Sequence, residues 1–274
     1  MLQSKLCILN GLNRHIREQM GECKNDMGGY FIIGGKEKVI VSQQKFGDNM
    51  MYIKDNYNDQ YSHSAEIRSV SENPAKPVRT TSVKMVRPNH LLTNNQLVVS
   101  IANIRQPIPL FIVMRALGII SDKKIIEYCL LDIDNMESYM EYFIPSVHDS
   151  GQILTKQSAL EYMASFTKSK TVHQVLEILS DYFLAHVGEN NYTIKAYFLG
   201  YMVNKLLRVV SKVEQPTDRD HFMYKRIELS GDLISQLCNE YYTLQQKHIF
   251  TTVSYTHLRA HETVLDLVCR LLLE

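Results

Sequence analysis

Tryptophan is absent from this sequence, and cysteine, proline and long apolar runs are scarce. With only 5 cysteines, the chain holds no Cys-x-x-Cys pair and no Cys/His pair at the spacing of a zinc site. An odd and scattered set of this kind predicts reduced thiols in a cytosolic or nuclear type of compartment rather than a disulfide framework. The cysteines are Cys7, Cys23, Cys129, Cys238 and Cys269.

No apolar run approaches the roughly 20 residues that a membrane-spanning helix needs. The best candidate is Ile108–Leu117, which Pro109 and Arg115 interrupt. The first residues, Met1–Lys5, also lack the apolar core of a signal peptide. The sequence therefore predicts a soluble protein with no membrane partner.

A net basic character is also missing, because 30 Lys and Arg residues stand against 29 Asp and Glu residues and leave a formal charge of +1. Any contact with nucleic acid would therefore need a local basic patch. The apolar fraction of 45% is enough for a packed core, and a length of 274 residues fits one large domain or two ordinary ones.

Catalytic motifs are absent as well: the chain shows no HExxH, GxSxG or GxxxxGKS pattern, and its 10 histidines are dispersed. Asp218–His221 offers two carboxylates and an imidazole, which suit a metal site or a general base. The alternative is a hydrogen-bonded polar turn between two helices, and it is favoured because no partner ligand has suggestive spacing. The residues identify no reaction.

The first part of the chain predicts β structure. Gly28–Gly35 is typical of a strand closed by a turn, and Lys38–Gln43 is typical of the returning strand. The Gly34-Gly35 dipeptide supplies the positive φ angles of a tight connection. The polar segment Lys45–Tyr61 predicts a loop or an irregular hairpin. Glu72–Pro77, with two prolines, is the strongest linker signal.

The second part turns helical after a few strands. Residues 80–86 and 96–103 predict strands, and Gly118 is placed to end a short helix that begins at Leu110. Apolar residues at three- and four-residue spacing then predict a series of helices. These helices are expected over residues 110–117, 122–132, 158–166, 172–183, 193–213 and 229–248.

Lys36-Glu37-Lys38 places three charges at the start of a strand whose next residues are apolar. Lys38 can face a phosphate backbone, or it can be a solvated edge lysine that discourages strand pairing. The pattern alone favours the edge lysine. Lys225-Arg226 is the densest basic pair in the second half, and such a pair is usually solvated.

Two separated stretches resemble one family. Residues 22–40 (ECKNDMGGYFIIGGKEKVI) resemble the EC-x-x-D-x-GGYFII-x-G-x-EKV pattern of the second-largest subunit of multisubunit DNA-directed RNA polymerases of the RNA polymerase II type. Residues 218–231 (DRDHFMYKRIELSG) resemble its DRDHFGKKRLDLAG pattern. Shorter similar stretches lie between them in the family's order, so the resemblance covers roughly residues 1–250. The sequence at residues 22–26 and 43–50 looks more like that of large nucleocytoplasmic DNA viruses than like the cellular RNA polymerase II form.

The resemblance implies an α+β fold of two domains, a partial β-containing protrusion and a mostly helical α+β lobe. It places the partial protrusion at residues 1–72, the lobe at 73–225 and a helical return to the protrusion at 226–250. Met1 looks internal to a longer chain. Residues 251–274 look like translated adapter sequence, and we expect this tail to be non-native and poorly anchored.

For function, the resemblance implies a part of the DNA- and hybrid-binding cleft in transcription, with nucleotidyl transfer run by the assembled complex and no catalytic residue here. No cofactor is expected in this fragment; in the family, magnesium is held mainly by the largest subunit. The implied partners are template DNA, the RNA–DNA hybrid, the largest subunit and other polymerase subunits. The implied location is the nucleus, or a cytoplasmic factory or virion for a viral enzyme. The residues expected to face nucleic acid are Lys36, Lys38, Gln43, Lys225 and Arg226.

A rival interpretation is a free-standing protein- or nucleic-acid-interaction module without catalysis. An unrelated enzyme is a third, which the missing acid/base and nucleophile constellations disfavour.

Overall fold

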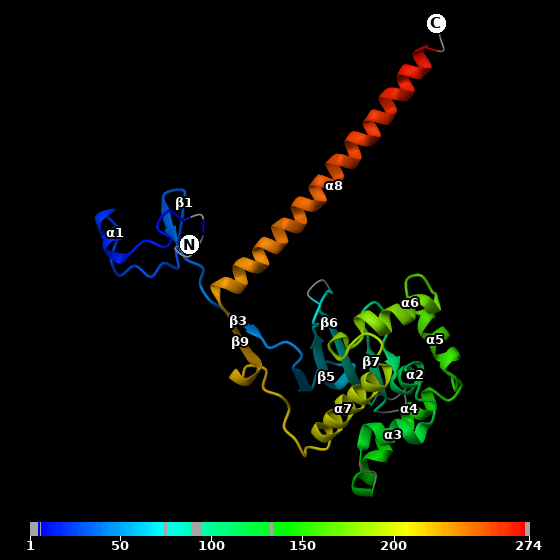
Figure 1. Ribbon diagram of the computed structural model, residues 1–274. Helices are drawn as coiled ribbons and strands as arrows, with labels where there is room; N and C mark the ends of the chain where they lie inside the picture. Colours follow the sequence, from blue (N-terminus) through cyan, green and yellow to red (C-terminus); the bar gives the residue numbers. More distant parts are fainter. Residues whose placement is uncertain (1–4, 6, 74–75, 89–94, 132–133, 272–274) are drawn as a thin grey trace. The chain divides into compact units, whose positions relative to one another are not determined.

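The structure is a computed structural model that describes residues 5, 7–73, 76–88, 95–131 and 134–271 (Figure 1). The chain forms two compact units. One contains residues 1–45 and 226–274, and the other contains residues 46–225. We call them the split unit and the central unit. None of the helices in the described part has the length and apolar character to cross a membrane.

The split unit begins with a short helix and a hairpin, and the hairpin confirms the turn predicted from the glycine pair. Gly34 and Gly35 have φ angles of 61° and 73°, which a two-residue hairpin turn of the mirror-image type requires. The strands are shorter than predicted, because pairing stops at Lys38. The elements are α1 (Arg14–Gln19), β1 (Phe31–Ile33) and β2 (Lys36–Lys38).

Two distant segments form a second two-stranded sheet, β3 (Gln43–Phe46) with β9 (Lys225–Glu228). An ion pair of 3.0 Å between Lys45 Nζ and a carboxylate oxygen of Glu228 joins them. The Lys45 ammonium, with a smaller contribution from Gln236, lowers the pKa of the Glu228 carboxyl. The chain thus enters and leaves the central unit through paired strands.

The central unit is built on a five-stranded antiparallel sheet in sequence order. Its first two strands lie in and just after Lys45–Tyr61, and they pair as an antiparallel hairpin, one of the two alternatives predicted for this segment. The outer face of these strands is polar, so their alternation gives a weak signal. Left-handed residues at Asn49 and Asn56 bound the first strand. The strands are β4 (Met51–Asp55), β5 (Tyr61–Ser69), β6 (Arg79–Val86), β7 (Leu97–Ser100) and β8 (Ile108–Pro109).

Helices cover one face of this sheet. In Figure 1, α7 (yellow) runs across the strands; it contacts β4, β5 and β6, while α2 contacts β7 and β8. The covered face carries the buried row Ala65, Val83 and Val99, which are cross-strand neighbours. The helical elements are α2 (Leu110–Ala116), α3 (Asp122–Leu130), η1 (Asp134–Tyr142), α4 (Ile144–Asp149), α5 (Lys156–Ser165), α6 (Val172–Glu177), η2 (Ile178–Tyr182), η3 (Ala185–Val187), α7 (Tyr192–Val210) and η4 (Phe222–Tyr224).

Two features of α7 fix its packing. A Cβ added at Gly200 would lie 2.3 Å from the carbonyl oxygen of Tyr128, so only glycine lets α3 approach this closely. Lys195 is fully buried, and its Nζ donates to the carbonyl oxygens of Leu179 at 2.7 Å and Ser180 at 2.8 Å. These carbonyls belong to the π-helical turn η2, where the normal helical bonding pattern is interrupted.

The boundary expected near Asn73 does not separate compact units in the structure. Strands β5 and β6 flank it and pair over Ser69↔Arg79 to Tyr61↔Val86. The compact unit therefore starts at Phe46, and the strands of residues 46–72 belong to the same sheet as the expected lobe. Pro74 lies outside the described residues, as does Met1. The assignment of these parts to a protrusion and a lobe stays a prediction.

Helix α8 (Ser230–Leu271) is longer than the predicted helix and continues through the expected tail. Its apolar positions Leu233, Ile234, Leu237 and Tyr241 were expected to pack on the first domain. Leu233 and Ile234 are half-buried, whereas Leu237 and Tyr241 are 50% and 65% exposed. The side chains described between Thr251 and His257 are also largely exposed.

Candidate nucleic-acid interface

Lys36 and Lys38 lie on one face of the β1–β2 hairpin. They pair across the strands with Ile33 and Phe31, whereas Glu37 pairs with Ile32 and points to the opposite face. Every residue of β2 is exposed. Neither lysine forms an ion pair within the described part of the chain. The hairpin therefore presents two adjacent ammonium groups to solvent.

Gln43 and Arg226 lie on the β3–β9 sheet, and both are exposed. The sheet brings together two candidates that are far apart in sequence. Lys45 and Glu228 belong to the same sheet and form an ion pair, so the Lys45 ammonium is less available to a phosphate than those of Lys36 and Lys38.

Lys225 is engaged within the central unit. Only 12% of its side chain is exposed, and its Nζ lies 3.2 Å from a carboxylate oxygen of Asp220 and 4.0 Å from the centroid of the Phe46 ring. The guanidinium of Arg219 lies 4.2 Å from the same centroid. Cations at these distances are attracted by the ring quadrupole. The geometry gives Lys225 an anchoring role at the point where the chain leaves the unit.

The segment after α7 forms the polar turn that the sequence favoured over a metal site. Asp218 accepts a bond of 2.9 Å from the N–H of Asp220, and His221 Nδ1 accepts one of 3.1 Å from the N–H of Met223. Over the part of the chain that the structure describes, no cluster of three or more His, Cys, Asp or Glu side chains could hold a metal ion.

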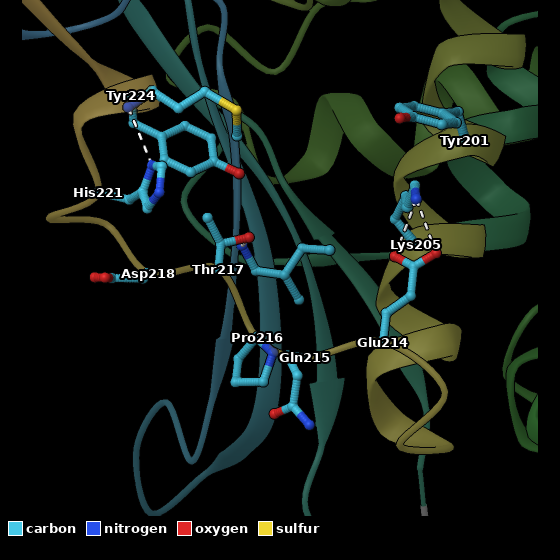
Figure 2. Close-up of a pocket in the computed structure, with 11 residues that line it drawn as sticks. Tyr201, Lys205, Glu214, Gln215, Pro216, Thr217, Asp218, His221 and Tyr224 are labelled. Atoms are coloured by element: carbon cyan, nitrogen blue, oxygen red, sulfur yellow. Dashed lines mark hydrogen bonds and ion pairs between the residues drawn. The ribbon is translucent and has the colours of Figure 1, made fainter.

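This segment also closes the open edge of β4. The N–H of Thr217 donates to the carbonyl of Ile53 at 2.9 Å, and the N–H of Ile53 donates to Thr217 Oγ1 at 3.2 Å. Figure 2 shows the cavity of about 420 Å³ between this segment and α7. Backbone groups that would expose a sheet edge are thereby satisfied.

Two cations on the α7 side of this cavity share one carboxylate. Lys205 Nζ lies 2.9 Å from both carboxylate oxygens of Glu214 (Figure 2). Arg208 lies 3.2 Å from one of these oxygens. The bond from Lys205, ahead of that from Arg208, lowers the pKa of the Glu214 carboxyl. The cavity is polar but carries no catalytic pairing of a nucleophile with a base.

Comparison with known proteins gives a consistent result. The family model described as RNA polymerase Rpb2, domain 2, matches residues 73–228. The chain is 37% identical over 246 residues to DNA-directed RNA polymerase II subunit RPB2 of Encephalitozoon cuniculi, covering 86% of this chain and 21% of that protein. It is 34% identical over 249 residues to DNA-directed RNA polymerase II subunit 2 of Arabidopsis thaliana, covering 86% of this chain and 21% of the relative.

A more distant relative is DNA-directed RNA polymerase subunit Rpo2 of Sulfolobus acidocaldarius. It is 28% identical over 226 residues, covering 80% of this chain and 19% of that subunit. The chain thus spans about a fifth of the length of the relatives it matches.

Proposed function

Because this chain belongs to the RNA polymerase Rpb2 family, that of the second-largest subunits of DNA-directed RNA polymerases, we propose that it forms part of the wall of a transcription cleft. In this role it contacts template DNA and the RNA–DNA hybrid through backbone phosphates. A polymerase must transcribe any sequence, so contacts that ignore base identity suit it. The observation that carries the proposal is the exposed pair Lys36 and Lys38 on one hairpin face.

The reaction of the assembled enzyme would be nucleotidyl transfer, with magnesium held mainly by the largest subunit. This chain would contribute position and charge rather than a reacting group. Its partners would be the largest subunit and the other polymerase subunits. Its location would be the nucleus, as the polymerase II relatives suggest, or a cytoplasmic factory or virion if the enzyme is viral.

The five nucleic-acid candidates differ in suitability. Lys36 and Lys38 carry exposed ammonium groups that form no ion pair in the described part of the chain. Gln43 and Arg226 are exposed on the β3–β9 sheet. Lys225 is the least suited, since Asp220 and Phe46 already hold its ammonium.

The test replaces Lys36 and Lys38 with Gln in the assembled polymerase and measures elongation-complex stability over a salt series. Each phosphate contact on duplex DNA contributes a log–log slope of about −0.9, so losing two should flatten the slope by about 1.8 for every template sequence. The matched control is Lys123→Gln with Lys124→Gln, an exposed pair on α3 that gives the same change of charge. Equal slopes in the hairpin variant and the wild-type enzyme would refute the proposal.

A further inference from the structure

The face of the central sheet that α7 leaves open carries a hollow of about 400 Å³. Its lining includes Arg68 of β5 and Thr80 of β6, which are cross-strand partners. Phe46, Tyr52 and Arg219 line it from the neighbouring segments. We call it the arginine hollow.

The arginine hollow is positively charged. Lys54 and Glu66 also line it, but they neutralise each other through a contact of 2.8 Å between Lys54 Nζ and the Glu66 carboxylate. Among the described residues, neither Arg68 nor Arg219 has a carboxylate partner. Two guanidinium groups therefore face one concave site without a carboxylate partner among the residues that the structure describes.

Aromatic rings support one of these guanidiniums. Arg219 lies 4.2 Å from the centroid of the Phe46 ring, a distance at which a planar guanidinium stacks favourably. The Phe46 ring is itself set edge-on to Tyr52, with centroids 6.4 Å apart, and Tyr52 lies 5.3 Å from Tyr224. The site therefore combines an oriented donor with an apolar wall.

We propose that the arginine hollow binds a carboxylate side chain from an acidic segment of a partner polypeptide. A carboxylate matches the forked guanidinium donors, and an apolar neighbour in the same segment can pack on the Phe46 ring. An extended phosphate backbone fits less well, because it needs cations along its whole path, whereas the two guanidiniums of Arg68 and Arg219 converge on one hollow of about 400 Å³.

The experiment measures binding of a short fluorescein-labelled peptide, rich in Glu and Phe, to the full chain by fluorescence anisotropy. Arg68→Gln and Arg219→Gln should each weaken binding about tenfold, since each removes a charge-assisted donor. Arg105→Gln is the matched control, because Arg105 is exposed outside the hollow and gives the same change of charge. Arg219→Lys should recover only part of the affinity, as an ammonium lacks the planar fork.

The same titration with a labelled single-stranded oligonucleotide of equal net charge separates the two partner classes. Tighter binding of the peptide, with the loss confined to Arg68 and Arg219, supports the proposal. Tighter, Arg68- and Arg219-dependent binding of the oligonucleotide would overturn it in favour of nucleic acid. Absence of peptide binding, or an equal loss in Arg105→Gln, would overturn it too.

Discussion

Lys195 offers the sharpest test of how the central unit is held together. Its ammonium is buried against the carbonyls of Leu179 and Ser180, and burial lowers the pKa of Lys195 to about 8, from 10.5. Asp181 opposes the lowering but does not cancel it. The difference between these two pKa values corresponds to about 3 kcal/mol.

The sign follows from proton linkage. The unfolded chain binds more protons than the folded chain between pH 8 and 10.5, so this lysine makes stability rise with pH across that window. A neutral amine still has two N–H donors, which is enough for both carbonyls. The contribution of Lys195 is therefore full above pH 10.5 and is lost as the pH falls through about 8.

The perturbation is Lys195→Met, which fills similar space but leaves two buried carbonyls without this donor. Each such carbonyl costs about 1–3 kcal/mol, while removal of the buried charge offsets about 3 kcal/mol near neutral pH. The variant's deficit should therefore be small at pH 7 and grow by about 3 kcal/mol by pH 10.5.

The assay is urea unfolding followed by circular dichroism from pH 7 to 10.5, expressed as the wild-type free energy of unfolding minus that of the variant. Taking this difference cancels the contributions of other titrating groups, such as the tyrosines, to the pH dependence of stability. Lys205→Met, on the same helix but ion-paired with Glu214, subtracts the general effect of losing a lysine. A deficit that stays constant over this pH range would refute the reasoning.

Two further predictions concern packing and the C-terminal segment. Gly200→Ala should lower the free energy of unfolding by about 1–3 kcal/mol, because its Cβ would lie 2.3 Å from the carbonyl oxygen of Tyr128. The control is Gly231→Ala, whose Cβ would have no atom within 4 Å and which should not destabilise the protein. Urea unfolding of both variants checks this, and equal effects would contradict it. Truncation after Phe250 should leave the melting temperature of the remaining chain unchanged, since the described side chains from Thr251 to His257 are largely exposed. A clear fall in a thermal scan would show that this segment supports the fold.

The sequence was sufficient for features that depend on local chemistry. The Gly34-Gly35 turn was predictable because only glycine adopts two successive positive φ angles readily. The long helix α7 was predictable because its apolar residues repeat at helical spacing. The RNA polymerase family was identified from ordered motifs, and the comparisons confirm it.

Features that depend on tertiary contacts were not predictable in this way. Lys195 lies in a helical pattern where lysine usually indicates the solvent face, and only the π-helical turn explains its burial. For strand β4 the sequence left a loop and an irregular hairpin open, because Lys54 and Tyr52 occupy its outer face and weaken the alternation. Arg219 was not singled out because its partner, Phe46, is distant in sequence. No local pattern in the sequence links Arg219 to Phe46, because the two residues meet only in the folded unit.

The pairing of β3 with β9 makes the central unit resemble an insertion in the rest of the chain. Its first and last residues, Phe46 and Lys225, lie on partnered strands, and their neighbours Gly47 and Tyr224 share a backbone bond of 2.6 Å. A segment whose two ends lie close together can be deleted, moved to another protein or circularly permuted without distorting the chain on either side. A short loop from Lys45 to Arg226 could therefore replace the whole unit.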